Sequence, residues 1–139
     1  LRVRNLELRR KLALNAIGGL RSLNEWAHAV WANAEEKGFR DFDPTSREAI
    51  AIYCTNLSGE VSELWEAFRD GRLYEPCDKA AKMAAAGIQP LTCVDEELAD
   101  IIIRALDVAA ALGRDIDMAV SSKHAFNKTR PFKHGGKRA

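Results

Sequence analysis

The chain has 139 residues, of which 47% are hydrophobic and 29% charged, and its formal net charge is +1. This balance is typical of one globular domain and excludes a disordered chain, while the near-neutral charge provides no global attraction to nucleic acid or to a membrane. The three cysteines form no CxxC pair, so the sequence predicts neither a zinc site nor a disulfide framework, and the cytoplasm is the expected location.

The predicted elements are helical along the whole chain, because no segment alternates polar and apolar residues at period two. A first helical region is expected over residues 5–37, with a bend at Gly18 and Gly19. Gly38 is expected to form its C-terminal cap, since glycine is favoured just past the end of a helix. The segment 41–44 is then expected to form a turn.

The second helix is expected to begin near Thr45 or Ser46 and to end before Gly71. A weaker helical turn is expected over residues 77–86, where alanine is frequent. The second helix carries apolar residues three and four positions apart, which predicts one buried face formed by Ile50, Tyr53, Leu57, Val61, Leu64 and Phe68.

The third helix is expected to begin after Thr92, whose hydroxyl can cap it, and to end at Gly113. Its predicted buried stripe is formed by Leu98, Ile102, Ala105, Ala109 and Leu112. A fourth helix is expected over residues 116–128, before Pro131. The expected fold class is therefore an all-α bundle of four to five helices.

Two pairs of acidic residues stand on the second and third of these helices. Glu60 and Glu63 lie within GEVSEL, and Glu97 and Asp100 lie within EELAD. Residues three apart share one face of a helix, and both pairs adjoin the predicted buried stripes, so packing of the two helices would bring four carboxylates together. A single ExxE pair is common on solvated helix faces, whereas two pairs beside one seam favour a metal site. All-carboxylate ligation predicts Mg²⁺ or Mn²⁺, because a hard divalent cation relieves the mutual repulsion.

These segments resemble a known family. GEVSEL followed by EELADIII resembles the signature of the MazG-like all-α nucleoside triphosphate pyrophosphohydrolases, and KHAFNKTRPFKHGGK resembles the ending of small members. The resemblance covers residues 20–139 and leaves residues 1–19 as an N-terminal extension without a counterpart. It implies a MazG-like bundle that hydrolyses an NTP or dNTP to the monophosphate and pyrophosphate, by attack of water on the α-phosphorus.

The resemblance also implies how the nucleotide is held. Glu60, Glu63, Glu97 and Asp100 are expected to bind one or more Mg²⁺ ions, with Mn²⁺ as a substitute, on the phosphate oxygens. Glu63, with Glu60 beside it, is the candidate that orients or deprotonates the attacking water. The candidate substrate contacts are Lys123, Asn127, Lys128 and Arg130 of the tail, together with Arg104, Trp31 and Asn24. A homodimer or homotetramer is expected, with neither a membrane nor a nucleic acid as partner.

Several of these residues have other interpretations. Arg104 is equally suited to an ion pair with Asp107 or another acid. The tail, which contains no Asp or Glu from Met118 onward, also fits a solvated or nucleic-acid-binding arm. The core is the first assignment for the aromatic and thiol side chains of Trp26, Trp31, Trp65, Cys54, Cys77 and Cys93.

Two other functional classes are open on the sequence alone. A non-enzymatic interaction or nucleic-acid-binding module would use the basic tail, but it leaves both carboxylate pairs unexplained. A di-iron bundle is disfavoured, because Glu25 and His28 provide one Glu-x-x-His spacing where such bundles use two. The sequence contains no GxxxxGK[ST] segment, which excludes a P-loop.

Overall fold

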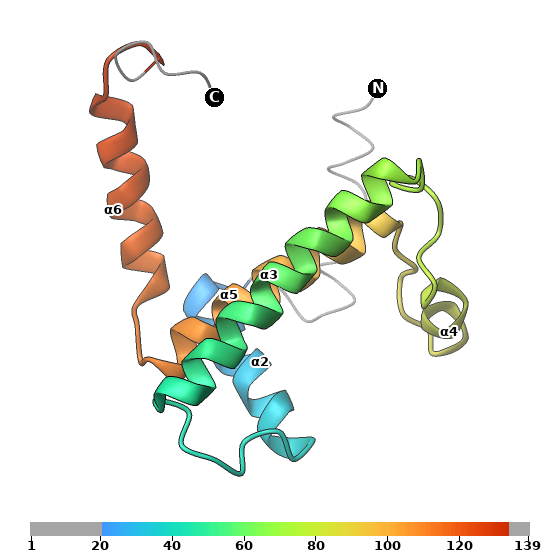
Figure 1. Ribbon diagram of the computed structural model, residues 1–139, viewed down its shortest axis with the longest axis horizontal. Helices are drawn as coiled ribbons and strands as arrows, with labels where there is room; N and C mark the ends of the chain where they lie inside the picture. The colour runs from blue at the N-terminus through green and yellow to red at the C-terminus, as the bar shows by residue number, and fades with distance from the viewer. Residues whose placement is uncertain (1–20, 134–139) are drawn as a thin grey trace.

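The computed structural model describes residues 21–133, and its regular structure there is entirely helical (Figure 1). The elements are α2 (Leu23–Glu36), α3 (Arg47–Arg69), α4 (Ala80–Ala85), α5 (Cys93–Ala111) and α6 (Ile116–Thr129). An isolated bridge between Pro76 and Thr92 is the sole β pairing in this part of the chain. The prediction of an all-α bundle is confirmed for these residues. The proposed extension over residues 1–19 and the bend at Gly18 and Gly19 lie outside them.

The helix ends follow local chemistry that the sequence makes visible. The side chains of Ser22, Ser46, Thr92 and Asp115 each accept a hydrogen bond from the backbone N–H three residues later, at the start of α2, α3, α5 and α6. Gly71 and Gly113, just after α3 and α5, have φ of 69° and 61°, a backbone region that favours glycine. The predicted ends of α3 and α5 are therefore confirmed.

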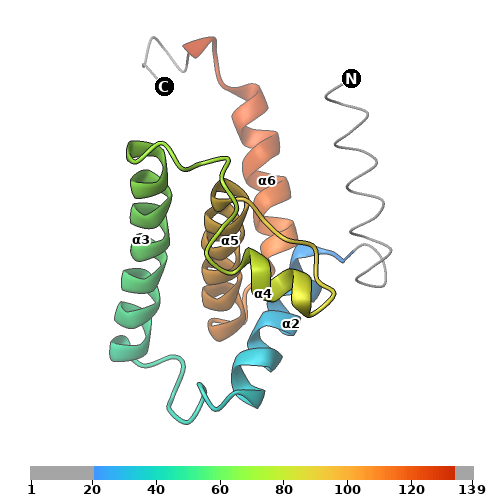
Figure 2. The same cartoon turned by 90° about the vertical axis from the view of Figure 1, so that its right-hand side faces the viewer.

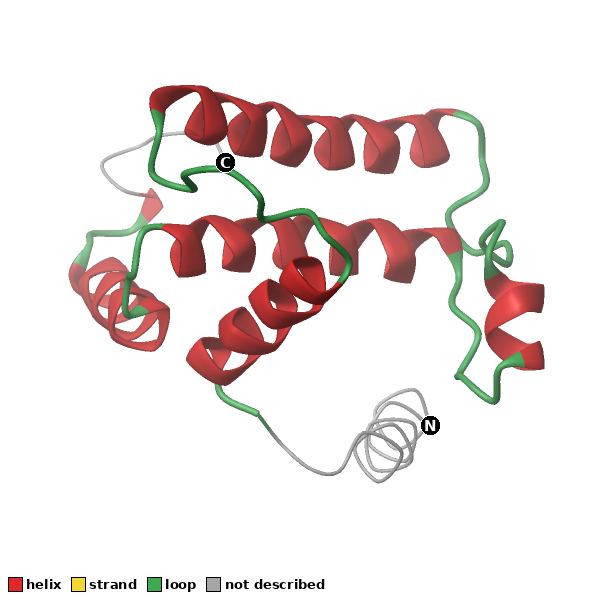
Figure 3. Ribbon diagram, turned by 90° about the horizontal axis from the view of Figure 1, so that it is seen from below, coloured by secondary structure: helices red, strands yellow, loops and turns green. Residues whose placement is uncertain are grey.

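Helices α3 and α5 run side by side in opposite directions and form the framework of the molecule (Figure 2, Figure 3). One small core joins the start of α3 to the end of α5 and contains Ala49, Tyr53 and Ala111, with Trp31, Ile50 and Val108 packed against it. A second core joins the end of α3 to α4 and contains Ala67, Cys77, Ala80 and Cys93. Between the two cores, α3 contains no fully buried residue from position 54 to position 66, the stretch that carries Glu60 and Glu63.

The predicted buried faces are only partly correct. Val61 and Phe68 of α3 are exposed, as are Leu98, Ile102 and Ala105 of α5 and Leu112 directly after it. The two helices bury small residues such as Ala49 and Ala109, and α5 also buries Glu96 and Asp107. Each helix has more apolar side chains than the rest of the described chain covers. The spacing of apolar residues along the helix therefore does not reveal which of its faces is buried. The core assignment is also wrong for Trp65, which is 59% exposed, and for Cys54.

Helix α6 extends away from the other helices and contains no buried residue (Figure 1). Its first turn is tied to the start of α2. The Asn24 side chain donates to Asp115 Oδ1 at 2.9 Å and accepts from the Ile116 N–H at 2.9 Å. The Asp117 carboxylate in turn accepts from the N–H groups of Leu23 and Asn24, at 3.0 and 3.1 Å. Each helix therefore caps the other. No helix among the described residues combines the length and hydropathy required to cross a membrane.

Candidate functional site

Carboxylates from α3 and α5 meet in the middle of the helix pair. One oxygen from each of Glu60, Glu63 and Glu97 lies within 4.8 Å of the others. Asp100, one turn after Glu97, lies beside this group and lines a cavity together with Glu60. The antiparallel packing of α3 on α5 therefore brings together three of the four residues singled out by the ExxE and ExxD spacing, Glu60, Glu63 and Glu97, with Asp100 next to Glu60.

Burial and mutual repulsion disfavour the ionised form of these carboxyl groups. Burial, and then the negative charges of Glu63 and Glu96, raise the pKa of Glu97 to about 7. Burial and the charge of Glu60 also raise the pKa of Asp100. Glu97 Oε2 is buried without a hydrogen-bond partner. An all-oxygen donor set with an orphaned buried carboxylate oxygen fits a hard divalent cation such as Mg²⁺.

Two basic side chains lie at the edge of the carboxylates. Arg104 Nε donates to Glu60 Oε1 at 2.9 Å, so the acid that Arg104 pairs with is Glu60 rather than Asp107. Lys79, in the loop before α4, pairs with the buried Glu96, and this hydrogen bond raises the pKa of Lys79. Sequence reasoning missed Lys79 because its contact depends on the path of the loop between α3 and α5, which no spacing reveals.

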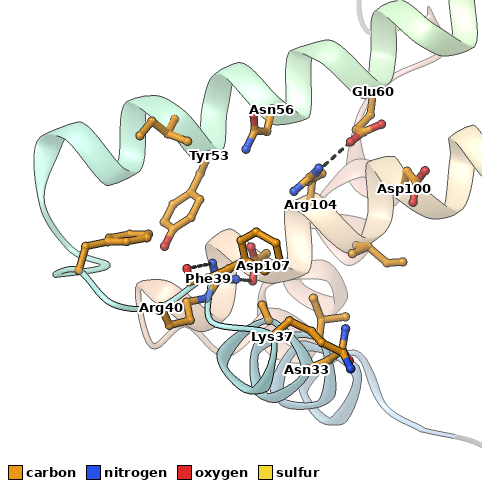
Figure 4. A pocket seen from close by; sticks show the side chains of 15 residues that line it. Asn33, Lys37, Phe39, Arg40, Tyr53, Asn56, Glu60, Asp100, Arg104 and Asp107 are labelled. Atoms are coloured by element: carbon orange, nitrogen blue, oxygen red, sulfur yellow. Dashed lines mark hydrogen bonds and ion pairs between the residues drawn. The ribbon is translucent and has the colours of Figure 1, made fainter.

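A cavity of about 570 Å³ lies between α2, the loop that follows it, α3 and α5 (Figure 4). Glu60, Asp100 and Arg104 line one end of it. Asn56 and Asn33 contribute polar groups to its wall. Its other end is formed by Phe39, Arg40, Phe42, Tyr53 and Asp107. The cavity thus joins a strongly acidic end to an end rich in aromatic side chains.

The aromatic end contains a buried ion pair between Arg40 and Asp107, whose side chains are 8% and 9% exposed. The Arg40 guanidinium lies 4.2 Å from the centroid of the Trp31 ring and 5.7 Å from that of Tyr53. Trp31 packs under Arg40 and against the core near Tyr53 and does not line the cavity. Sequence reasoning missed Arg40, since it lies in a loop and pairs with a residue 67 positions away.

The other candidate substrate contacts lie apart from the carboxylates. Asn24 is used in the contact between α2 and α6 described above. The tail residues Lys123, Asn127, Lys128 and Arg130 lie on α6 or directly after it, and none of them forms a hydrogen bond or ion pair with the carboxylates within the described part of one chain. Glu25 and His28 are exposed on α2, outside the carboxylate group.

Comparison with protein-family models, curated proteins and solved structures finds no match to this chain. The function must therefore be argued from the side chains that the fold brings together.

Proposed function

We propose that the protein is a Mg²⁺-dependent nucleoside triphosphate pyrophosphohydrolase of the MazG-like type. The observation that carries this proposal is the meeting of Glu60, Glu63 and Glu97 within 4.8 Å, at a point where Glu60 also lines a cavity of about 570 Å³ together with Asp100. Such a group repels itself unless a cation is bound, and a polyphosphate needs the same cation to approach it. The cavity provides space for the rest of a nucleotide.

In this proposal Glu60, Glu63, Glu97 and Asp100 hold Mg²⁺, and Mn²⁺ can replace it. When bound, the ion neutralises phosphate oxygens and stabilises the negative charge that grows in the transition state. Arg104, which Glu60 holds at the acidic end of the cavity, adds positive charge for the same phosphates.

The proposed hydrolysis needs a group that removes a proton from water. Glu63 is the exposed member of the carboxylate group, so its oxygens are accessible to water while Glu97 is partly buried. Glu63 orients the water and accepts its proton as the oxygen attacks the α-phosphorus. The bond from the α-phosphorus to the bridging oxygen breaks, and pyrophosphate leaves with both electrons of that bond. The products are the nucleoside monophosphate and pyrophosphate.

We further infer that the protein acts as a homodimer or homotetramer. Helix α6 buries no residue in the described chain, and its basic side chains find no acidic partner there. The carboxylate group of a second copy has the complementary charge. Lys123, Asn127, Lys128 and Arg130 can serve the proposed site in this way, by reaching the nucleotide bound to the other copy.

The test is a panel of NTPs and dNTPs incubated with the protein and Mg²⁺, with products identified by phosphorus NMR. The proposal expects pyrophosphate and a monophosphate from at least one nucleotide, and no turnover with EDTA. Release of orthophosphate, or no turnover of any nucleotide, would overturn it.

Variants of α3 then test the role of Glu63. Glu63→Gln should lower kcat by at least about 100-fold, the usual contribution of a general base. Glu66→Gln changes an exposed glutamate on the same helix and should leave kcat unchanged. Circular dichroism should show equal helix content in both variants. Full activity of Glu63→Gln would remove Glu63 from the mechanism.

A further inference from the structure

The aromatic end of the cavity contains a rigidly held guanidinium group. Arg40 is fixed from one side by its ion pair with Asp107 and from another by the Trp31 ring, 4.2 Å away. A planar group held in this way presents its remaining N–H donors in fixed directions. The position of Arg40 is therefore set before any ligand arrives.

Two polar groups at this end are buried and have no partner. Arg40 Nε and the Tyr53 hydroxyl form no hydrogen bond in the described structure, although Tyr53 is only 5% exposed. Buried donors without partners destabilise a fold and are therefore rare in proteins. Both residues line the cavity, and Figure 4 shows them grouped with Asp107 at the end away from Glu60. Their pairing groups are thus best supplied by a ligand.

The charges at this end select the kind of ligand. Asp107 offsets the positive charge of Arg40, so a phosphate would gain little electrostatic attraction at this end. The phosphate would also be repelled by the Asp107 carboxylate. Arg40 Nε can only donate, so the ligand atom opposite it must be an acceptor. Phe39, Phe42 and Tyr53 add aromatic surface, which suits a flat ring. A planar heterocycle with carbonyl or ring-nitrogen acceptors meets these conditions.

The separation of the two ends also suits a nucleotide. Tyr53 and Glu60 are seven residues apart on α3, which is about 10 Å along a helix axis. A ring bound near Tyr53 and phosphates bound near Glu60 would then belong to one molecule, with the sugar beside Asn56 between them.

We propose that Arg40 and Tyr53 form a nucleobase subsite in which the Arg40 Nε–H and the Tyr53 hydroxyl donate to an acceptor edge of the base. This inference rests on the proposed function and adds its base selectivity. Guanine, cytosine, uracil and thymine carry a carbonyl oxygen that matches two donors, whereas adenine has no carbonyl group and carries an amino group beside its N1 and N7 acceptors. Bases with a carbonyl group should therefore bind more tightly than adenine.

The test measures binding by calorimetry with GMP, CMP, UMP, dTMP and AMP in the presence of Mg²⁺, and no turnover occurs because a monophosphate has no anhydride bond to hydrolyse. Tyr53→Phe removes only a hydroxyl that has no protein partner, so the melting temperature should be unchanged or higher. Its affinity for the tightest-binding monophosphate should nevertheless fall about tenfold, with a smaller loss for AMP. Tyr74→Phe, which removes the hydroxyl of an exposed tyrosine, is the matched control and should bind like the wild type.

A second variant keeps the ion pair. Arg40→Lys can still pair with Asp107 but lacks the Nε–H, and it should show the same loss of affinity, while Arg114→Lys at an exposed position should not. Wild-type affinity in both Tyr53→Phe and Arg40→Lys, tightest binding of AMP, or no binding of any monophosphate would overturn the subsite. Pyrophosphate release with unaltered binding in these variants would reject the subsite alone. Binding that depends on Tyr53 without pyrophosphate release would reject the proposed reaction alone.

Discussion

At the scale of single residues, Glu97 experiences the strongest conflict between burial and charge in the proposed metal site. It is partly buried, its Oε2 has no partner, and its neighbours Glu63, Glu96 and Asp100 are all acidic. Without a metal ion, the folded chain must therefore bind a proton on Glu97 at a pH where an unfolded chain has released it.

This conflict predicts how stability depends on pH in EDTA. The pKa of Glu97 is raised from 4.5 to about 7 by folding, so between these values the folded state binds more protons than the unfolded state. The free energy of unfolding contributed by Glu97 is then fully present below about pH 4.5 and is lost as the pH rises through about 7. Urea denaturation at intervals across this range should show the decrease.

The variant Glu97→Gln supplies the control for this prediction, because an amide does not titrate. Its stability should fall less steeply between pH 4.5 and 7, with a remaining slope from Asp100, whose pKa is also raised. An identical slope in wild type and variant would show that Glu97 is not the group that titrates.

The residues of the proposed site differ in how far the sequence predicts them. Glu60 and Glu63, or Glu97 and Asp100, share a helix face by spacing alone, and that spacing was enough to select them. The pairs of Arg40 with Asp107 and of Lys79 with Glu96 join loops to α5 across 67 and 17 positions. Such contacts depend on where a loop runs, which local periodicity does not encode.

At the scale of elements, the ends of helices were predictable and the buried faces were not. A cap is chosen within one turn, so Ser46 and Thr92 mark their helices without knowledge of the fold. The buried face depends on what packs against the helix. Here the start of α3 packs on the end of α5 through Ala49, Tyr53 and Ala111, while Ile102 is exposed.

The mutual capping of α2 and α6 leads to a prediction about Asn24. Asn24→Ala removes its hydrogen bonds to Asp115 and to the N–H of Ile116, and it should lower the free energy of unfolding by about 1 to 2 kcal/mol. Asn33→Ala, at an exposed position of the same helix, should change stability much less. Equal stability of the two variants by urea denaturation would contradict the capping role.

At the scale of the whole molecule, the described chain leaves much apolar surface uncovered. Trp65 stacks on Phe68 with ring centroids 5.6 Å apart, and both rings are more than half exposed. Exposed apolar surface of this kind is a common sign of an interface. The exposed apolar residues are therefore consistent with the proposed homodimer or homotetramer.

This surface predicts self-association. Light scattering coupled to size exclusion should give twice or four times the chain mass of 15.4 kDa at micromolar concentration. Trp65→Glu, which places a charge on the exposed aromatic pair, should shift the population toward the monomer. A wild-type protein that stays monomeric at these concentrations would contradict the inference.

The proposed metal site is tested most directly by Mn²⁺ binding, followed by electron paramagnetic resonance, in the wild type and in single variants of the four acids. We expect each single variant to bind Mn²⁺ at least about tenfold more weakly than the wild type, which is the usual scale for altered metal sites. The variants are Glu60→Gln, Glu63→Gln, Glu97→Gln and Asp100→Asn. Glu66→Gln removes one negative charge from an exposed position of α3 outside the carboxylate group, and this variant should bind Mn²⁺ as the wild type does. Equal affinity in all six proteins, or no Mn²⁺ binding by the wild type, would contradict a shared metal site between α3 and α5.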